Sequence, residues 1–308
     1  MTESEYSINF NDLKYKKYRK LDPTKITTFR KSNKDYNEKL EKIYLNTNLD
    51  TIKYRLKECI KNGKKILDLK YLELKMFPDL DSDIIENLEE LYIGNNELES
   101  LPDLNHFKNL LVLDISINKI NKLKKMPKKL IEFTCFDNKI EDISNISVCA
   151  NLKTLFISNN LITSLDFLNN HQNLEILMAN NNKISDIPQN IIKIRKIHIR
   201  NNNITKIKSY NNLIYLDCQN NNLEYIAPMN NLRDLILSDN TQIEDIPVFK
   251  SLKYLEILNT NISKIKYMNK LEELICIKDC VKYISSKYKL DYSSIHKDKY
   301  LNLFFIPN

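Results

Sequence analysis

The chain has 308 residues, of which 42% are hydrophobic and 28% charged, and its formal net charge at pH 7 is +7. It contains only two glycines, Gly63 and Gly94, which excludes glycine-rich phosphate-binding loops, because these need several closely spaced glycines. No apolar run approaches the 18 residues of a membrane-spanning helix, so we expect no membrane span.

The first residues, MTESEYSINFNDLKYKKYRK, lack the apolar core of a secretory signal. The six cysteines also lack the paired spacings of a disulfide framework. Both features favour a reducing compartment, so we expect an intracellular, cytoplasmic protein. The abundance of Asn, Ile and Lys is typical of AT-rich genomes, including those of some protists and their large DNA viruses, and a viral source would place the protein in a host cell.

Residues 1–63 form the first predicted region, a basic N-terminal arm followed by a helical cap. They hold 15 Lys and Arg against 9 Asp and Glu, so most of the net charge of the chain lies there. Residues 14–31 carry eight cations, one acid and two interleaved tyrosines. This mixture can bind nucleic acid or an anionic surface weakly, although a solvated basic tail is the simpler interpretation.

Two helices are expected before residue 64, near 34–45 and over 50–63. In the second, Ile52, Leu56, Cys59 and Ile60 recur at helical spacing. Asp50 is a candidate N-cap and Gly63 a candidate stop. Together the helices would cover the open end of whatever structure follows.

From residue 64 onward one pattern, L-x-x-L-x-L-x-x-N-x-L, repeats about eleven times at spacings of 19–24 residues. LKTLFISNNLI (152–162), LEILMANNNKI (174–184) and IRKIHIRNNNI (194–204) are consecutive copies. The ninth position is asparagine in eight copies, namely Asn96, Asn118, Asn138, Asn160, Asn182, Asn202, Asn221 and Asn240. Composition bias does not place eight asparagines in register.

This pattern resembles the leucine-rich repeat family, in particular its short-repeat members such as internalins and phosphatase-regulating proteins. The resemblance implies an α/β solenoid, a horseshoe of about eleven repeats over residues 64–284. A parallel β-sheet would line the concave face, and short turns or one-turn helices the convex face. Residues 285–308 would form a C-terminal cap. The family chiefly supplies binding scaffolds and adaptors, so the resemblance implies a protein that binds another protein. We expect it to be a monomer.

The residues themselves support this fold. The fourth and sixth positions are two apart, so they share one face of a short strand and point inward. The ninth-position asparagines can both donate and accept hydrogen bonds, so we expect them to form a ladder that satisfies the turn after each strand. In IRKIHIRNNNI, Asn202 is the rung, and composition bias accounts for Asn201 and Asn203.

The candidate binding residues occupy the third, fifth and seventh positions, which face outward from the sheet. Four apolar residues from three consecutive repeats, Phe136, Phe156, Ile176 and Met178, are predicted to form one patch that marks a partner site. The cations Lys196, His198 and Arg200 lie directly beside it. This combination suits a partner with apolar anchors and acidic residues. The alternatives are a patch covered by a terminal flank and a solvated charge row. The concave candidates also include Tyr92 and Tyr215.

Other reactive side chains are assigned structural or surface roles. Cys135, Cys218 and Cys276 take the inward sixth position and are expected in the core. His106 and His171 precede repeats and are expected on the surface. No catalytic, cofactor or metal-binding constellation is found, so the chain is not expected to be an enzyme. The second functional hypothesis is a nucleic-acid-associated protein that uses the basic arm.

Overall fold

The computed structural model describes residues 50–277, 290–291 and 300–305. The chain divides into two compact units, Met1–Thr47 and Asn48–Asn308, and the described residues all belong to the second. The expected helix near 34–45 and the basic stretch at 14–31 lie outside them. No helix in the described ranges is long and apolar enough to cross a membrane.

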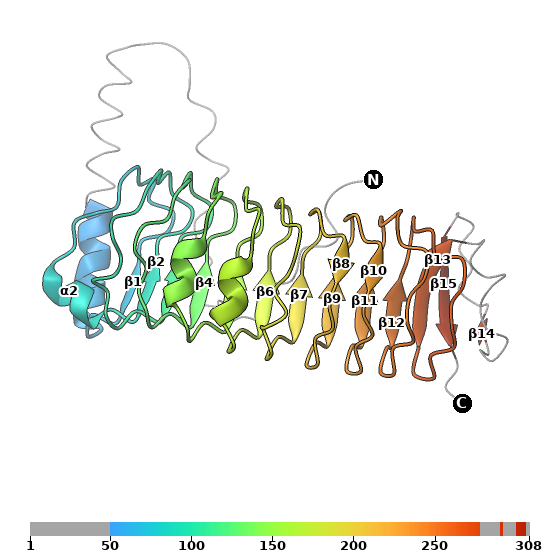
Figure 1. Ribbon diagram of the computed structural model, residues 1–308. Helices are drawn as coiled ribbons and strands as arrows, with labels where there is room; N and C mark the ends of the chain where they lie inside the picture. The colour runs from blue at the N-terminus through green and yellow to red at the C-terminus, as the bar shows by residue number, and fades with distance from the viewer. Residues whose placement is uncertain (1–49, 278–289, 292–299, 306–308) are drawn as a thin grey trace, which may run out of the picture. The chain divides into compact units, whose positions relative to one another are not determined.

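The second unit is a solenoid in which each repeat adds one short strand to a parallel sheet (Figure 1). The predicted leucine-rich repeat fold is therefore confirmed. In spatial order the parallel strands are β1 (Ile66–Asp68), β2 (Glu90–Tyr92), β3 (Val112–Asp114), β4 (Glu132–Thr134), β5 (Thr154–Phe156), β6 (Ile176–Met178), β7 (Lys196–His198), β9 (Tyr215–Asp217), β11 (Asp234–Ile236), β12 (Tyr254–Glu256) and β13 (Glu273–Ile277).

Side-chain direction follows the repeat pattern. Leu155 at the centre of β5 and Ile157 just after it have no exposed surface, and the equivalent residues of the next repeats, Leu177 and Ala179, are equally buried. The third and fifth positions face the other side, because successive strand residues alternate. We call that side the concave face. The inward residues of all repeats join one continuous core, as stacking neighbours requires.

The C-terminal edge of the parallel sheet is covered by antiparallel strands. β15 (Tyr300–Phe305) pairs along the whole of β13, and β14 (Leu290–Asp291) pairs with β15. A covered edge cannot pair with another chain, which is the function expected of a cap.

At the other end, residues 50–61 are helical and pack Ile52, Leu56 and Cys59 toward the core. Gly63 ends the helix with a φ of +76°. The Lys64 N–H donates to the carbonyl of Cys59 at 2.8 Å, and the Gly63 N–H donates to that of Ile60 at 3.2 Å. These two bonds form a Schellman motif, so the predicted stop is confirmed.

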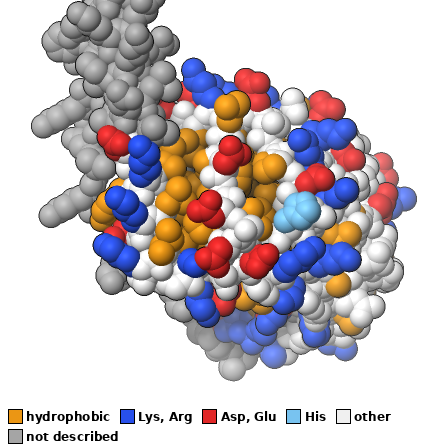
Figure 2. Space-filling model, turned by 90° about the vertical axis from the view of Figure 1, so that its left-hand side faces the viewer, with side chains coloured by type: hydrophobic (Ala, Val, Ile, Leu, Met, Phe, Trp, Pro, Cys, Tyr) orange, Lys and Arg blue, Asp and Glu red, His pale blue; other side chains and the backbone are white. Residues whose placement is uncertain are grey.

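Two details of this cap differ from the prediction. Asp50 is already helical, so it is not the N-cap. Ile60 is 47% exposed, because it lies beside the face that Cys59 buries. Figure 2 shows the α2 end of the stack, where hydrophobic side chains gather between acidic and basic ones.

The return segments, on the side opposite the sheet, match the expected turns and single-turn helices. They contain α2 (Ser82–Asn87) and two 3₁₀ helices, η3 (Ser144–Val148) and η4 (Asp166–Asn170). Two later repeats cross back through short extended pieces instead, β8 (Lys206–Ile207) and β10 (Tyr225–Ile226), which pair in parallel. Repeats of 19 and 20 residues have less chain for a helical turn than repeats of 22, so they return more directly.

The predicted asparagine ladder is present, and Asn160 is a representative rung. Its Nδ2 donates to the carbonyls of Ile157 and Ser158 in its own turn and to Cys135 of the preceding repeat, at 3.0–3.2 Å. Its Oδ1 accepts from the Ile140 N–H at 3.0 Å. Each rung therefore satisfies backbone groups of two repeats at once.

The neighbouring eighth position carries a second ladder that the sequence reading assigned to composition. Asn201 has a φ of +56°, and its side chain donates to Asn181 and accepts from Asn220. Asparagine is among the few residues that adopt this left-handed conformation readily. Attributing Asn201 to composition bias was therefore wrong. The positive-φ residues of this row are Asn95, Ile117, Asp137, Asn159, Asn181, Asn201, Asn220, Asp239 and Asn259.

His171 was predicted to lie on the surface, but it is fully buried. It follows η4, and its ring nitrogens lie 3.0 Å from the Phe167 carbonyl and 3.1 Å from that of Ile146. Burial lowers the pKa of His171, although the two carbonyls oppose that shift. The imidazole thus joins the return segments of two repeats.

The cysteines of the repeats behave as small core residues. Cys135, Cys218 and Cys276 are fully buried, as predicted, and all three are free thiols. Burial raises the pKa of the Cys135 and Cys218 thiols, which keeps them protonated.

Candidate functional site

The sheet register brings the four predicted apolar residues together on the concave face. Phe156 of β5 is paired with Met178 of β6, and Ile176 is the partner of Thr154. Phe136 follows β4, the strand on the other side of β5. Strands in a sheet are about 4.8 Å apart, so Phe156 and Met178 are immediate neighbours, and Phe136 and Ile176 lie diagonally beside Phe156. We call the four residues the apolar patch.

The apolar patch is packed rather than projecting. Phe156 is only 7% exposed, and the other three members are half-buried. Side chains on adjacent parallel strands shield one another, so the patch is a smooth surface of ring and methyl groups. A smooth apolar surface of this kind can be covered by a partner with little ordering of long side chains.

Two cations border the patch on β7. Ile176 and Met178 are register partners of Lys196 and His198, and Arg200 follows two residues later. Lys196 is exposed and Arg200 half-buried. Neither forms an ion pair within the described part of the chain. The Nε of Arg200 is buried there without a hydrogen-bond partner.

His198 does not belong to the cationic row. Its ring lies 4.6 Å, centroid to centroid, from that of Tyr215 on β9. Burial, together with the charges of Lys196 and Arg200, lowers the pKa of His198 to about 4. The imidazole is therefore neutral at pH 7. Counting His198 as a cation was wrong, because its surroundings disfavour a charge.

Acidic side chains flank the patch and the cations, and the sequence reading gave them no role. Glu90, Asp114 and Glu132 come from β2, β3 and β4, and we call them the acidic field. Burial raises the pKa of Glu132, and the charges of Asp114 and Glu90 raise it further. The signal was available, because Glu90 and Glu132 occupy the outward third position in EELYI and IEFTC.

The two predicted tyrosines lie at opposite ends of this surface. Tyr92 on β2 lies within the acidic field, where its hydroxyl donates to Glu90 at 2.7 Å and Lys70 Nζ lies 4.8 Å from its ring. Tyr215 lies beyond the cations, next to Asp217, whose pKa is raised chiefly by burial. The candidate site thus extends from β2 to β9, with the order acidic, apolar, cationic, acidic.

A family model described as "Leucine Rich repeats (2 copies)" matches residues 128–170 and 150–193. The chain belongs to the leucine-rich repeat family. Leucine-rich repeat domains typically mediate protein–protein interaction and are generally not enzymes. In the described ranges no group of three or more His, Cys, Asp or Glu side chains could hold a metal ion.

Curated leucine-rich repeat relatives match only part of the chain. Human leucine-rich repeats and immunoglobulin-like domains protein 3 is 28% identical over 171 residues, covering 52% of this chain and 15% of that protein. A protein phosphatase 1 regulatory inhibitor subunit homolog from Arabidopsis thaliana is 34% identical over 105 residues, covering 33% and 32% respectively. The alignments span less than a third of either relative.

Solved leucine-rich repeat structures share the fold. The functional domain of InlJ from Listeria monocytogenes superposes with a TM-score of 0.56 at 24% identity, covering 74% of this chain and 55% of that one. A chain of the complex of latrophilin 3, Unc5D and FLRT2 gives a TM-score of 0.56 at 17% identity, covering 70% and 77%.

Proposed function

We propose that this protein recognises a partner protein through the concave face, across β2 to β9. The partner segment places apolar anchors on the apolar patch and carboxylates on Lys196 and Arg200. It crosses the strands, because the patch and the cations lie on successive strands rather than along one.

The observation that carries this proposal is Arg200. Its guanidinium is half-buried, has no ion pair among the described residues and holds a buried Nε without a hydrogen-bond partner. A buried donor without a partner costs about 1–3 kcal/mol. A carboxylate that binds the planar guanidinium in two-pronged fashion would remove that cost.

The acidic field indicates the orientation in which the partner segment crosses the strands. From β3 to β7 there are four strand spacings, about 19 Å, which an extended peptide crosses in about six residues. A partner with cations over Glu132 and Asp114 and carboxylates over Arg200 would match both ends. The reverse orientation would place like charges together.

The test is affinity capture from nuclease-treated lysate with the full chain, comparing Lys196→Glu/Arg200→Glu with a matched control, Lys139→Glu/Lys183→Glu. Both pairs change the net charge equally, but Lys139 and Lys183 are exposed tenth-position residues outside the concave face. We expect the concave variant to lose proteins that the control retains. If both variants retain the same proteins as the wild type, the concave face is not the contact.

Nuclease treatment separates this proposal from nucleic-acid binding by the basic arm. Residues 14–31 lie outside the described ranges, so that second function stays a prediction from composition. Binding through phosphates would weaken steeply with salt, whereas the apolar contact would not.

A further inference from the structure

The concave face continues past β9 onto β11 and β12, where its fifth-position row places an apolar residue between two acids. Ile236 of β11 is the register partner of Asp217 on β9 and of Glu256 on β12. Two strand spacings, about 10 Å at the backbone, separate the acidic residues. The half-buried Ile236 therefore forms an apolar floor between two carboxylates.

Hydrogen bonds direct the Glu256 side chain toward this floor. The hydroxyl of Ser238, which follows β11, donates to Glu256 Oε1 at 2.7 Å. The Tyr254 hydroxyl donates to Oε2 at 2.9 Å. Since Ser238 belongs to the repeat of β11, its bond draws the carboxylate from β12 back over β11. The Glu256 carboxylate thus lies nearer to Asp217 than its own strand does.

Asp217 is a buried carboxylate without a counter-charge. It is 7% exposed, and its Oδ1 accepts from the Gln219 N–H at 3.2 Å. Burial raises the pKa of Asp217, against the Gln219 hydrogen bond and the charge of Arg200. Neither Arg200 nor any other cation of the described residues forms an ion pair with it. Burying a carboxylate without a cation is costly, so a cationic ligand would stabilise this one.

The Tyr215 ring bounds the same site. Its centroid lies 4.6 Å from that of the neutral His198 ring on β7, so its other face is directed toward β11. Burial raises the pKa of its hydroxyl, and the charges of Asp217, Asp234 and Glu256 raise it further. Carboxylates from three strands therefore lie around one ring. Tyrosine rings attract guanidinium groups through their π face.

Asp234 is the third of these carboxylates. It is half-buried at the third position of β11 and forms no ion pair within the described ranges. Burial raises its pKa, whereas the charges of Arg233, Lys253 and Lys196 lower it. Lys253 is itself paired with Glu272, at 2.6 Å. The cations near the site thus leave its carboxylates without a direct partner among the described residues.

We propose that this surface binds the side chain of an arginine in the partner segment. The guanidinium lies over Ile236, with one edge toward Asp217 and the other toward Glu256. Its plane packs against the Tyr215 ring. Arginine suits this arrangement better than lysine, because its planar fork bridges two carboxylates and stacks on aromatic rings.

This inference rests on the proposed function, because the arginine belongs to the segment that places carboxylates on Lys196 and Arg200. From β7 to β11 there are two strand spacings, about 10 Å, which an extended chain crosses in about three residues. The partner segment therefore has an arginine about three residues from the acidic residue that contacts Arg200.

The test uses two fluorescein-labelled peptides that contain two phenylalanines, a glutamate and, three residues from the glutamate, either arginine or glutamine. Each is made in both chain directions, and fluorescence anisotropy measures its Kd for the full chain. The site variant is Asp217→Asn/Glu256→Gln, which removes two charges and keeps the shape of both side chains. Circular dichroism verifies folding.

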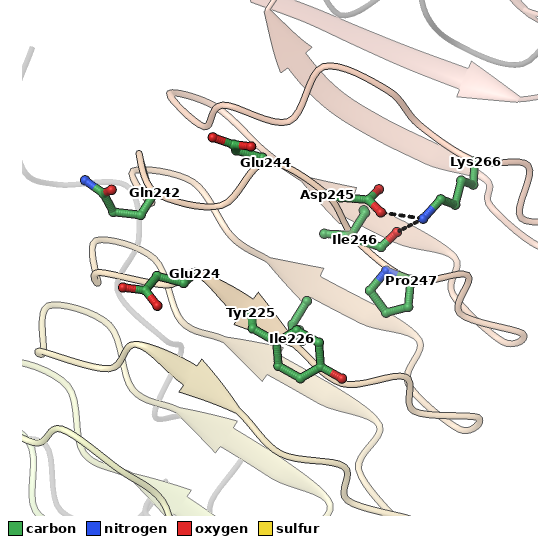
Figure 3. Close-up of a pocket in the computed structure, with 9 residues that line it drawn as sticks. All are labelled: Glu224, Tyr225, Ile226, Gln242, Glu244, Asp245, Ile246, Pro247 and Lys266. Atoms are coloured by element: carbon green, nitrogen blue, oxygen red, sulfur yellow. Dashed lines mark hydrogen bonds and ion pairs between the residues drawn. The ribbon is translucent and has the colours of Figure 1, made fainter.

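The matched control is Glu224→Gln/Glu244→Gln. These carboxylates are exposed and lie apart on the return side, in the repeats of β9 and β11 (Figure 3). They form no ion pair within the described part of the chain. The control therefore removes the same charge without touching the concave face.

We expect the wild type to bind the arginine peptide about tenfold more tightly than the glutamine peptide, as a charge-assisted contact implies. The site variant should bind both peptides alike, and the control should keep the preference within about twofold. Asp234→Asn should reduce the preference about threefold, and it serves as the site variant if the double substitution does not fold.

The arginine site is overturned if the wild type shows no preference, or if the site variant keeps it. It is also overturned if the control loses the preference as well. The proposed function stands in these cases if Lys196→Glu/Arg200→Glu abolishes binding of the glutamine peptide. If the wild type binds neither peptide, both proposals fail.

Discussion

A single asparagine in each repeat carries hydrogen bonds that the backbone cannot make for itself. Asn160 is 6% exposed and makes four such bonds, one as acceptor and three as donor. The side chain therefore supplies the turn carbonyls of two repeats with the hydrogen bonds that water would otherwise make. Leucine has the same number of side-chain heavy atoms with the same branching, but it neither donates nor accepts.

We predict that Asn160→Leu lowers the free energy of unfolding by about 1–3 kcal/mol, because it leaves buried polar groups unpaired. Urea unfolding followed by circular dichroism measures this. Asn203→Leu is the control, since Asn203 is exposed and lies outside both ladders. Equal stability of the two variants would show that the ladder adds nothing to the fold.

Residue-level prediction from sequence succeeded where the repeat itself carried the information. The ninth-position asparagines and the inward Cys135 were placed correctly by register alone. The role of Asn201 was missed, because a position that prefers a positive φ produces no hydrophobic periodicity. The high asparagine content of the chain also hides such a position. The burial of His171 and the neutral state of His198 depend on contacts between repeats, which no single copy of the pattern contains.

At the scale of one turn, the left-handed eighth position is the most restrictive site in the repeat. Ile117 occupies it with a φ of +52°, although a β-branched residue is strongly disfavoured there. Its side chain is also 38% exposed, so it contributes little to the core.

We predict that Ile117→Asn raises the free energy of unfolding by about 1 kcal/mol, because asparagine relieves the backbone strain and can extend the exposed ladder toward Asn95. The control is Leu161→Asn, which removes a similarly exposed side chain, 36%, at a residue without positive φ. Thermal unfolding of both variants decides the matter. A destabilised Ile117→Asn variant would contradict the assignment of strain to this turn.

The position of each sheet strand was predictable from the sequence. For the return segments, only the kind of structure, short turns or single-turn helices, was predictable. Each strand of the parallel sheet has its own pair of inward apolar residues, so these strands follow from the period. The return segments have few anchors, and their form depends on repeat length and on single residues. Pro247, which ends the pairing begun by β8 and β10, is one example.

Across the whole described unit, charge is sorted along the stack rather than balanced within each repeat. On the concave face the acidic field, the apolar patch and the cations of β7 follow one another in order. This order needed the sheet register, because third- and fifth-position residues of different repeats become neighbours only after stacking.

The fully buried His171 and the half-buried His198 predict that acid destabilises the solenoid. The folded-state pKa of His198 is lowered from 6.5 to about 4, and that of His171 is lowered as well. Below pH 6.5 the unfolded chain therefore binds protons that the folded chain does not, so stability falls as the pH drops toward about 4. Asp217 and Glu132 act oppositely, since their raised pKa values mean that protonation relieves a cost.

The His198 contribution can be isolated with His198→Gln, using His106→Gln, at an exposed residue, as the control. We predict that the wild type loses at most about 2 kcal/mol more than His198→Gln between pH 7 and pH 5, because one group contributes about 1.4 kcal/mol per pH unit in this window. The carboxylate effects are common to both proteins and cancel in the difference. Urea unfolding at the two pH values measures it. Identical losses in the wild type and His198→Gln would mean that His198 titrates normally, and its assignment as a neutral member of the binding face would then fail.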